Sequence, residues 1–216
     1  MKAHLVAPPD PSSISVASLS CIVAGLLQED WVCCPGFLPH ARIMALRQEC
    51  QALHGAGRFR AAGVGREAAH EPAVRGDEIL WLEERADWAP EAAGLLRDEF
   101  SALRDAINAE TFLGLQDFEG HYAVYPAGTR YARHVDRFRD DSRRVISLVF
   151  YLNEDWNPEE GGELCLYRGL ADRDPAARIT PQGGTLVCFL SDAVPHEVLP
   201  SLRPRLSLTG WFRRRP

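Results

Sequence analysis

Two histidines, an aspartate and an arginine in the second half of the chain have the spacing of a metal site with an anion-binding neighbour. His134 and Asp136 lie two residues apart in a run expected to be a strand, so their side chains point to the same side. His196 lies on a later expected strand, and Arg205 follows it nine residues further on. Two histidines and one carboxylate can occupy one face of an octahedral Fe(II) and leave three positions open. The sequence therefore predicts an iron site formed by His134, Asp136 and His196.

Arg205 lies on the last expected strand, where it shares one face with Thr209 and Trp211 while Leu206 and Leu208 share the other. A buried arginine beside an iron site is costly unless it meets an acid. Because its planar fork matches a carboxylate, we expect Arg205 to hold the far carboxylate of a dicarboxylic co-substrate. The alternative is that these residues are ordinary polar groups of a β-sandwich.

The first half of the chain is expected to supply helices that support the site. Apolar residues recur at helical spacing over 14–28, 39–53 and 90–110, and short strands are expected at 31–34 and 77–82. Residues 55–76 combine many glycines and alanines with little periodicity, which predicts a mobile loop.

The second half changes to short apolar or alternating runs separated by Pro and Gly turns, which indicates an antiparallel sandwich or barrel. The expected strands are 119–125, 131–134, 144–152, 163–167, 178–180, 185–190, 196–199 and 205–212. Helices first and strands afterwards predict an α+β unit in which helices buttress a β core.

Length and composition narrow the function classes. The 216 residues are 46% hydrophobic and 25% charged, which excludes disorder as the main state. The net charge of −6 argues against a nucleic-acid or membrane-surface partner. No signal peptide or membrane-length apolar run is expected, and the six cysteines have no CxxC spacing, so we expect reduced thiols and a cytoplasmic location. We expect residues 1–13 to form a flexible tail and 14–216 a single domain, with helical support over 14–110, a β core over about 112–212, and a monomeric state.

Several stretches of the chain resemble the oxygen-sensing type of 2-oxoglutarate/Fe(II)-dependent prolyl 4-hydroxylases. The resemblance extends over about residues 30–213, and the stretches that carry it are VRGDEILWLE, HYAVYPAGTRYARHVD, RRVISLVFYLNEDW, GGELCLY, SDAVPHEVLP and RPRLSLTGWF. It implies a double-stranded β-helix (jelly roll) core buttressed by N-terminal helices. It also implies Fe(II), 2-oxoglutarate and O2 as cofactors, with ascorbate as a reductant.

The resemblance assigns roles to individual residues. It places the metal ligands at His134, Asp136 and His196 and the co-substrate arginine at Arg205. The remaining positions that match are the co-substrate-pocket residues Tyr125, Tyr151 and Thr209 and the substrate-side residues Asp77, Arg144 and Trp211.

The same resemblance suggests an ion pair between Asp77 and Arg144 that shapes the substrate cleft; the alternative is two independent surface charges. His121, on the strand before the metal motif, is expected to be a core or rim histidine and not a ligand. The chain departs from the family pattern at Phe150 and in a turn after Tyr125 that is one residue shorter. The sequence of the 55–76 loop also differs, which leaves the substrate open.

The function expected from the resemblance is hydroxylation of a proline in a protein loop, giving 4-hydroxyproline, succinate and CO2. The bacterial substrate of the family, elongation factor Tu, is one candidate protein partner. Two alternatives stay open: an oxygenase of the same fold that acts on another peptide or a small molecule, and a catalytically silent binding module. Trp211 stands where nucleic-acid-repair members of this fold typically have a second arginine, which argues against that branch.

Overall fold

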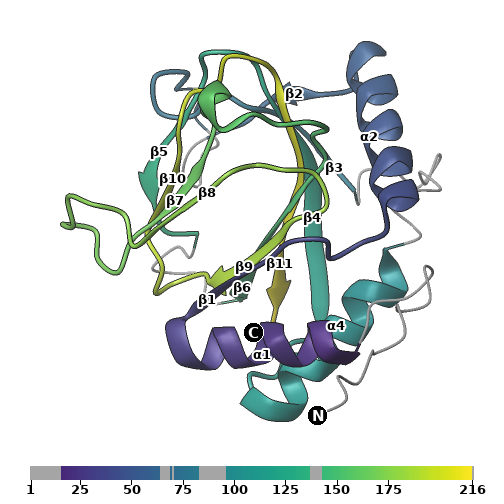
Figure 1. Cartoon of the computed structure of the whole chain (residues 1–216), viewed down its shortest axis with the longest axis vertical. Coiled ribbons are helices and arrows are strands. Elements are labelled where there is room, and N and C mark those ends of the chain that lie inside the picture. The colour runs from purple at the N-terminus through teal and green to yellow at the C-terminus, as the bar shows by residue number, and fades with distance from the viewer. Residues whose placement is uncertain (1–15, 64–68, 70, 83–95, 137–142, 216) are drawn as a thin grey trace, which may run out of the picture.

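The computed structural model describes residues 16–63, 69, 71–82, 96–136 and 143–215, and within them antiparallel strands make up most of the regular structure (Figure 1). The expected tail at 1–13 lies outside these residues. In chain order the elements are α1 (Val16–Glu29), β1 (Trp31–Cys34), α2 (His40–Gly55), β2 (Arg60–Ala61), β3 (Glu78–Trp81), α4 (Arg97–Thr111), β4 (Asp117–Tyr125), β5 (Tyr131–His134), β6 (Arg144–Tyr151), the 3-10 turn η1 (Pro158–Glu160), β7 (Leu164–Leu166), β8 (Ala177–Ile179), β9 (Leu186–Leu190), β10 (His196–Val198) and β11 (Arg205–Arg213).

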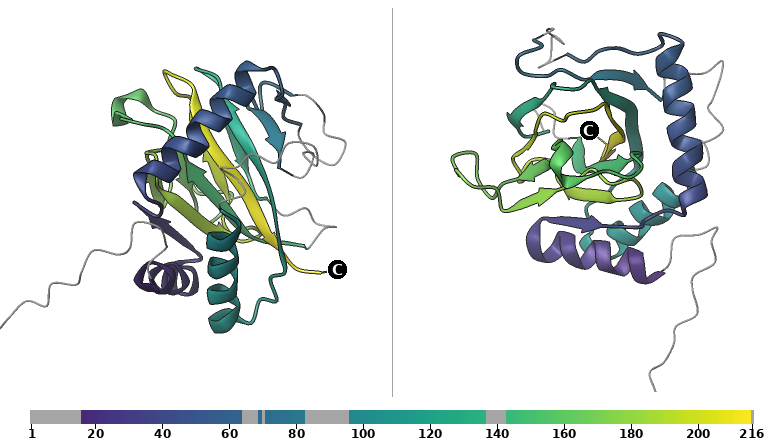
Figure 2. Two further views of the ribbon diagram at one scale, coloured as in Figure 1. Left: turned by 90° about the vertical axis from the view of Figure 1, so that its right-hand side faces the viewer. Right: turned by 45° about the horizontal axis from the view of Figure 1, so that its top comes forward.

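The strands form two sheets that face each other. The larger sheet has the order β1-β9-β6-β11-β4-β3-β2 and the smaller has the order β5-β10-β7-β8. All the strand pairs are antiparallel. Seen from above in Figure 2 (right), the sheets curve around a common core and the helices lie outside it. This arrangement confirms the predicted double-stranded β-helix with helical support.

Alternation along the strands separates a helix-facing layer from an inner layer. In β11, the side chains of Leu206, Leu208 and Phe212 join the apolar cluster that contains the buried faces of α1, α2 and α4. The alternate residues of the same strand point the other way, toward the smaller sheet, as the sequence predicts. They are Arg205, Ser207, Thr209 and Trp211. The helices therefore cover one side of the larger sheet and leave its other side free to line a site.

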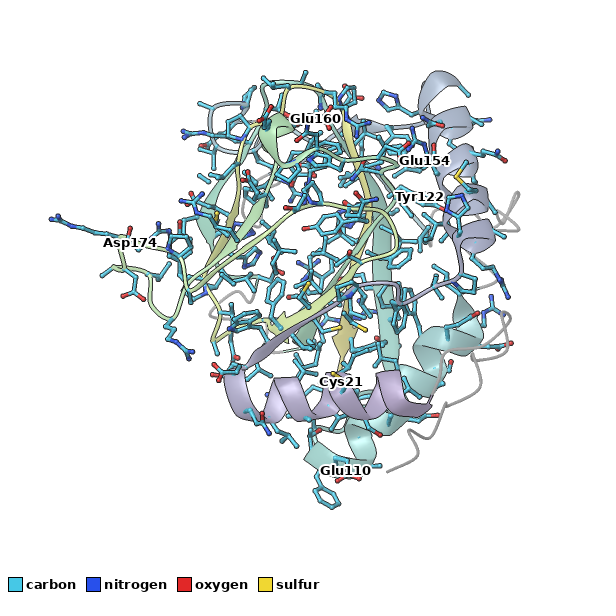
Figure 3. All side chains as sticks on the ribbon, in the orientation of Figure 1. Cys21, Glu110, Tyr122, Glu154, Glu160 and Asp174 are labelled. Carbon is cyan, nitrogen blue, oxygen red and sulfur yellow. The ribbon has the colours of Figure 1, made fainter. Side chains whose placement is uncertain are left out.

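A long-range hydrogen bond ties helix α2 to the sheet. Tyr122 of β4 points toward α2 (Figure 3), and its hydroxyl donates to the Glu49 carboxylate at 2.9 Å across 73 residues of sequence. The tyrosine ring is fully buried, so the bond gives its hydroxyl the partner that burial requires.

The structure differs from the sequence-based expectation in the first half of the chain. Strands β1, β2 and β3 join the larger sheet, so the β core is not confined to 112–212. Part of the expected mobile loop 55–76 is regular, because Arg60 and Ala61 pair with β3 and Arg75 bridges to Tyr131. An exposed sheet edge needs hydrogen-bond partners, and these short segments supply them to β3 and β5.

The six cysteines are free thiols, as predicted. Among the residues described, no helix combines the length and the apolar character that crossing a bilayer requires.

Candidate metal centre and its pocket

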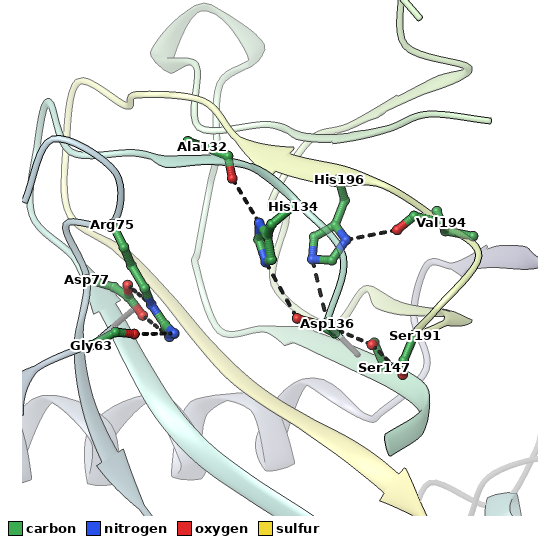
Figure 4. A network of polar contacts seen from close by, with 10 residues as sticks. All are labelled: Gly63, Arg75, Asp77, Ala132, His134, Asp136, Ser147, Ser191, Val194 and His196. Atoms are coloured by element: carbon green, nitrogen blue, oxygen red, sulfur yellow. Dashed lines mark hydrogen bonds and ion pairs between the residues drawn. The ribbon is translucent and has the colours of Figure 1, made fainter. Parts of the chain in front are cut away.

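A histidine and an aspartate that lie two residues apart meet a histidine from a distant strand at the edge of the smaller sheet. Strand β10 pairs with β5 so that His196 lies directly opposite His134, and Asp136 follows two residues after His134. The Nε2 atom of His134 is 3.5 Å from Asp136 Oδ1, and the Nε2 atom of His196 is 3.7 Å from Asp136 Oδ2 (Figure 4). One ligand atom from each residue lies within 4.8 Å of the others, which is compatible with a shared cation.

Backbone contacts orient both imidazole rings. His134 Nδ1 lies 2.8 Å from the Ala132 carbonyl oxygen, and His196 Nδ1 lies 3.1 Å from the Val194 carbonyl oxygen. A carbonyl oxygen only accepts, so each Nδ1 carries a proton and Nε2 is the ring nitrogen that faces Asp136. Burial and the nearby His134 lower the pKa of His196 to about 4, so this ring is neutral at pH 7 and suited to bind a metal.

Asp136 is the negative member of the cluster. Burial alone would raise the pKa of its carboxyl group, but His196, His134 and the hydroxyl of Ser147 lower that pKa well below its ordinary value. Two imidazoles and one carboxylate with open space in front are a donor set that fits Fe(II). The ring of Tyr131 stacks on His134 with centroids 3.6 Å apart and limits rotation of that ligand.

A cavity of about 530 Å³ opens in front of the cluster. Inward-facing residues of β3, β4 and β11 form its floor, and it has two ends. We call the part around Tyr125, Arg205 and Ser207 the arginine end, and the part around Trp81, His121, Arg144 and Trp211 the tryptophan end. Arg205 and Trp211 are six positions apart on β11, which is roughly 20 Å of extended chain.

Arg205 dominates the arginine end. Its side chain is 2% exposed, and its Nε and Nη1 atoms have no hydrogen-bond partner. Nη2 donates to the Tyr151 hydroxyl at 3.4 Å, and the guanidinium carbon lies 4.8 Å from the Tyr125 ring centre and 5.1 Å from that of Tyr151. No carboxylate of the residues described forms an ion pair with it, and such a group is stable only when an anion arrives. The end therefore fits one carboxylate of a dicarboxylic acid.

The two tyrosines beside Arg205 stay protonated. Burial raises the pKa of both phenols above the ordinary value, so each hydroxyl can donate a hydrogen bond. Tyr125 and Thr209 line the cavity, whereas Tyr151 lies behind Arg205 and reaches the site through the guanidinium.

Elsewhere along the cavity, the structure replaces the expected ion pair between Asp77 and Arg144 with two separate pairs. Asp77 accepts two hydrogen bonds from Arg75, at 2.7 and 2.9 Å. Arg144 donates two hydrogen bonds to Glu119, at 3.0 and 2.9 Å, and its guanidinium carbon lies 3.5 Å from the centre of the Trp211 ring. Asp77 is satisfied by Arg75, two residues away along the chain, and Arg144 is satisfied by Glu119 on β4. Asp77, Arg144 and Trp211 nevertheless line the same cavity.

His121 is the residue of this region that the sequence did not assign to the site. It is 2% exposed, lines the cavity and lies between Trp81 and Trp211, with ring centroids 4.8 and 5.6 Å away. Burial and the charge of Arg75 lower its pKa to about 3, so it is neutral. The expectation of a core or rim histidine holds. Its place in the cavity could have been read from the strand period that it shares with Tyr125.

Four more residues support the site without an earlier sign in the sequence. Arg75 and Glu119 are the observed partners of the two substrate-side charges. Ser147 and Ser191 stand behind Asp136. Serine and charged residues are common in strands, so residue type alone did not single them out.

Comparison with known proteins agrees with this geometry. Residues 120–213 match the family model described as 2OG-Fe(II) oxygenase superfamily. The human protein "Egl nine homolog 1" is 34% identical over 173 residues, which is 76% of this chain and 39% of that protein. This chain thus spans about two fifths of that relative's length.

Two solved structures cover nearly all of the chain. A prolyl-4-hydroxylase from Pseudomonas putida is 44% identical with a TM-score of 0.81, over 92% of this chain and 100% of that one. A prolyl hydroxylase from Trichoplax adhaerens, solved with a peptide of the oxygen degradation domain of hypoxia-inducible factor, is 26% identical with a TM-score of 0.81, over 90% of this chain and 88% of that one.

Proposed function

Because the chain belongs to the 2-oxoglutarate- and Fe(II)-dependent oxygenase superfamily, we propose that it hydroxylates C4 of a proline in a protein loop. The products are 4-hydroxyproline, succinate and CO2. One observation carries the proposal: the His-Asp-His cluster and the buried Arg205, which has no ion-pair partner among the residues described, line the same cavity. A metal site alone would fit many reactions, whereas the added carboxylate receptor fits a keto acid that binds beside the metal.

The iron ligands in this proposal are His134, Asp136 and His196. Bound Fe(II), together with 2-oxoglutarate, supplies the activation of O2. The chain supplies the ligands in the required protonation state, because backbone carbonyls hold each Nδ1 proton and neighbouring donors keep Asp136 ionised.

Arg205, Tyr151, Tyr125 and Thr209 hold the co-substrate. The Nε and Nη1 atoms of Arg205 donate to its far carboxylate, while Tyr151 fixes the guanidinium from behind. Burial of this end excludes water, so the pair is stronger than it would be at the surface.

The tryptophan end receives the prolyl side of the substrate, with Trp211 and Arg144 as contacts, while Asp77 is a contact from another part of the cavity lining. Trp81, His121 and Trp211 offer flat apolar faces on which a prolyl ring can lie, and none of the three carries a charge. The partner that we propose is elongation factor Tu, the bacterial substrate that the family resemblance implies.

Mass spectrometry tests the reaction and the substrate together. The Fe(II)-loaded protein is mixed with 2-oxoglutarate, air and purified bacterial elongation factor Tu, with His134→Ala as the control. We expect a gain of one oxygen on a proline, absent with the control. Succinate without modified elongation factor would retain the oxygenase and reject this partner. Neither product in an iron-replete sample would favour a silent binding module.

Oxygen sensing, a cytoplasmic location and a monomeric state stay predictions. A KM for O2 far above cellular concentrations would support a sensing role. Fractionation of cells and the mass of the protein in solution test the other two.

A further inference from the structure

Two buried serines stand behind the proposed iron ligand Asp136, on the side away from the cavity. Ser147 of β6 is 1% exposed, and Ser191, directly after β9, is 0% exposed. The Ser147 hydroxyl lies 2.6 Å from Asp136 Oδ2 and 2.9 Å from the Ser191 hydroxyl (Figure 4). Neither serine lines the cavity, so neither can touch a substrate there.

The protons in this chain of hydroxyls have one consistent direction. The Ser147 hydroxyl donates to Asp136 Oδ2, because a carboxylate that binds a metal can only accept. Ser147 has a single proton, and Ser191 must therefore donate to Ser147. A hydroxyl that accepts one hydrogen bond becomes a better donor of its own, so the outer serine strengthens the inner contact.

The backbone of Ser191 holds the same unit together. Its amide donates to the Val145 carbonyl at 3.0 Å, and its own carbonyl accepts from the Asp136 amide at 3.1 Å. Residues from β6, the end of β9 and the segment after β5 are therefore fixed to one another within a few bonds of the carboxylate.

The place of Ser147 in the sheet argues for a specific role. Its partners across the sheet are Phe189 and Trp211, and the inward positions that follow it on β6 are Val149 and Tyr151. A buried hydroxyl among large side chains costs free energy unless it is hydrogen-bonded. Here its hydrogen-bonding capacity is directed to one oxygen of Asp136.

We propose that Ser147, supported by Ser191, is a positioning residue that keeps Oδ2 of Asp136 engaged, so that this aspartate binds iron through one oxygen only. The inference rests on the proposed iron site. Three protein ligand atoms leave three of six positions free, two for 2-oxoglutarate and one for O2. A second carboxylate oxygen on the metal would occupy one of these positions, and the hydroxyl of Ser147 competes against that arrangement.

Co(II) binding to the metal-free protein tests this without any turnover. Ser147→Ala is expected to weaken Co(II) binding about tenfold, because the carboxylate loses its outer partner. At saturating Co(II), it should also bind 2-oxoglutarate several-fold more weakly and show a changed visible Co(II) spectrum. Ser147→Thr keeps the hydroxyl and should restore all three readouts, and Ser191→Ala should lie between wild type and Ser147→Ala.

Ser201→Ala is the matched control. Ser201 is also buried, and its hydroxyl donates to the Arg203 carbonyl, away from Asp136. Its variant should bind Co(II) and 2-oxoglutarate like wild type.

The outcomes separate the possible errors. Wild-type Co(II) affinity and spectrum in Ser147→Ala would overturn the proposal. Weaker Co(II) binding with unchanged 2-oxoglutarate affinity would leave Ser147 as a support and reject the one-oxygen role. If Ser147→Ala does not fold, folded Ser191→Ala decides, and wild-type values there would reject the serine pair. Failure of wild type itself to bind Co(II) would reject the iron site instead.

Discussion

The two ends of the cavity differ in whether their charged side chains have partners within the protein. At the arginine end, a buried guanidinium has two donor atoms without partners, so this end is incomplete until an anion binds. At the tryptophan end, the charged Arg144 already has a partner, because it pairs with Glu119. Arg75 and Asp77, which also line the cavity, pair with each other. The comparison indicates that the co-substrate is selected by charge. We expect the second substrate to be selected by shape and by apolar contact, because the charged groups near it are already neutralised.

The largest loss of activity is expected from a substitution in the His-Asp-His cluster, because both ends of the cavity depend on the metal. Asp136→Ala removes the only carboxylate of the His-Asp-His cluster, and we expect no measurable formation of succinate or hydroxylated product and strongly weakened Co(II) binding. Asp174→Ala, which removes an exposed carboxylate, is the control and should match wild type. Retained activity in Asp136→Ala would show that the cluster is not the metal site.

Arg205→Ala tests the incomplete end. Each hydrogen bond to a charged group contributes about 1.5–3 kcal/mol and Arg205 offers two such donors, so we expect the KM for 2-oxoglutarate to rise by about 100-fold or more. Arg205→Lys keeps the positive charge without the planar fork, so its KM for 2-oxoglutarate should lie between those of wild type and Arg205→Ala. The exposed Arg178→Ala should leave the KM unchanged. An unaltered KM in Arg205→Ala would remove the basis of the comparison.

His121 tests whether the tryptophan end excludes charge. Its pKa is about 3 in the folded protein and about 6.5 when unfolded, so protons bind the unfolded chain first as the pH falls below 6.5. Stability is therefore full above pH 6.5 and is lost as the pH falls toward 3. Between about pH 7.5 and 5, wild type should lose about 2 kcal/mol more unfolding free energy than His121→Gln.

Urea unfolding of both metal-free proteins at the two pH values measures this difference. Contributions from other groups cancel in the comparison when they are the same in both proteins. Equal pH dependence would mean that His121 becomes charged inside the fold, and that the tryptophan end tolerates charge.

The smallest effect is expected at the paired charges. Arg144→Ala removes a partly exposed ion pair and a guanidinium stacked on Trp211, so the KM for a prolyl peptide should rise about fivefold. The KM for 2-oxoglutarate should stay the same. Arg104→Ala removes an ion pair with Asp105 on helix α4 and serves as the control. A rise in both KM values would mean that the two ends are not independent.

The sequence was most informative about which side chains share a face of a single strand or helix. The alternation of β11 predicted that Arg205 and Trp211 share one face, and the HxD spacing predicted that His134 and Asp136 point together; the structure agrees with both. Helix α2 buries Ile43, Leu46 and Cys50 as its period predicts. These features depend on local geometry, which residue types reveal directly.

The sequence was least informative for pairs of charges. Asp77 and Arg144 were expected to meet, but the closer Arg75 and Glu119 are their partners. The choice among several nearby opposite charges depends on differences of a few ångströms, and residue types do not encode these distances.

The amino-acid sequence by itself determined the chemistry of this protein: two imidazoles, a carboxylate and a guanidinium on strands whose alternation directs them inward. Only the tertiary structure decided which residues lie next to these groups and support them. The antiparallel register sets His196 opposite His134, and the meeting of β6 with the end of β9 places two serines behind Asp136. These contacts join residues from 11 to 62 positions apart, and they form only when the packing of the two sheets brings those residues together.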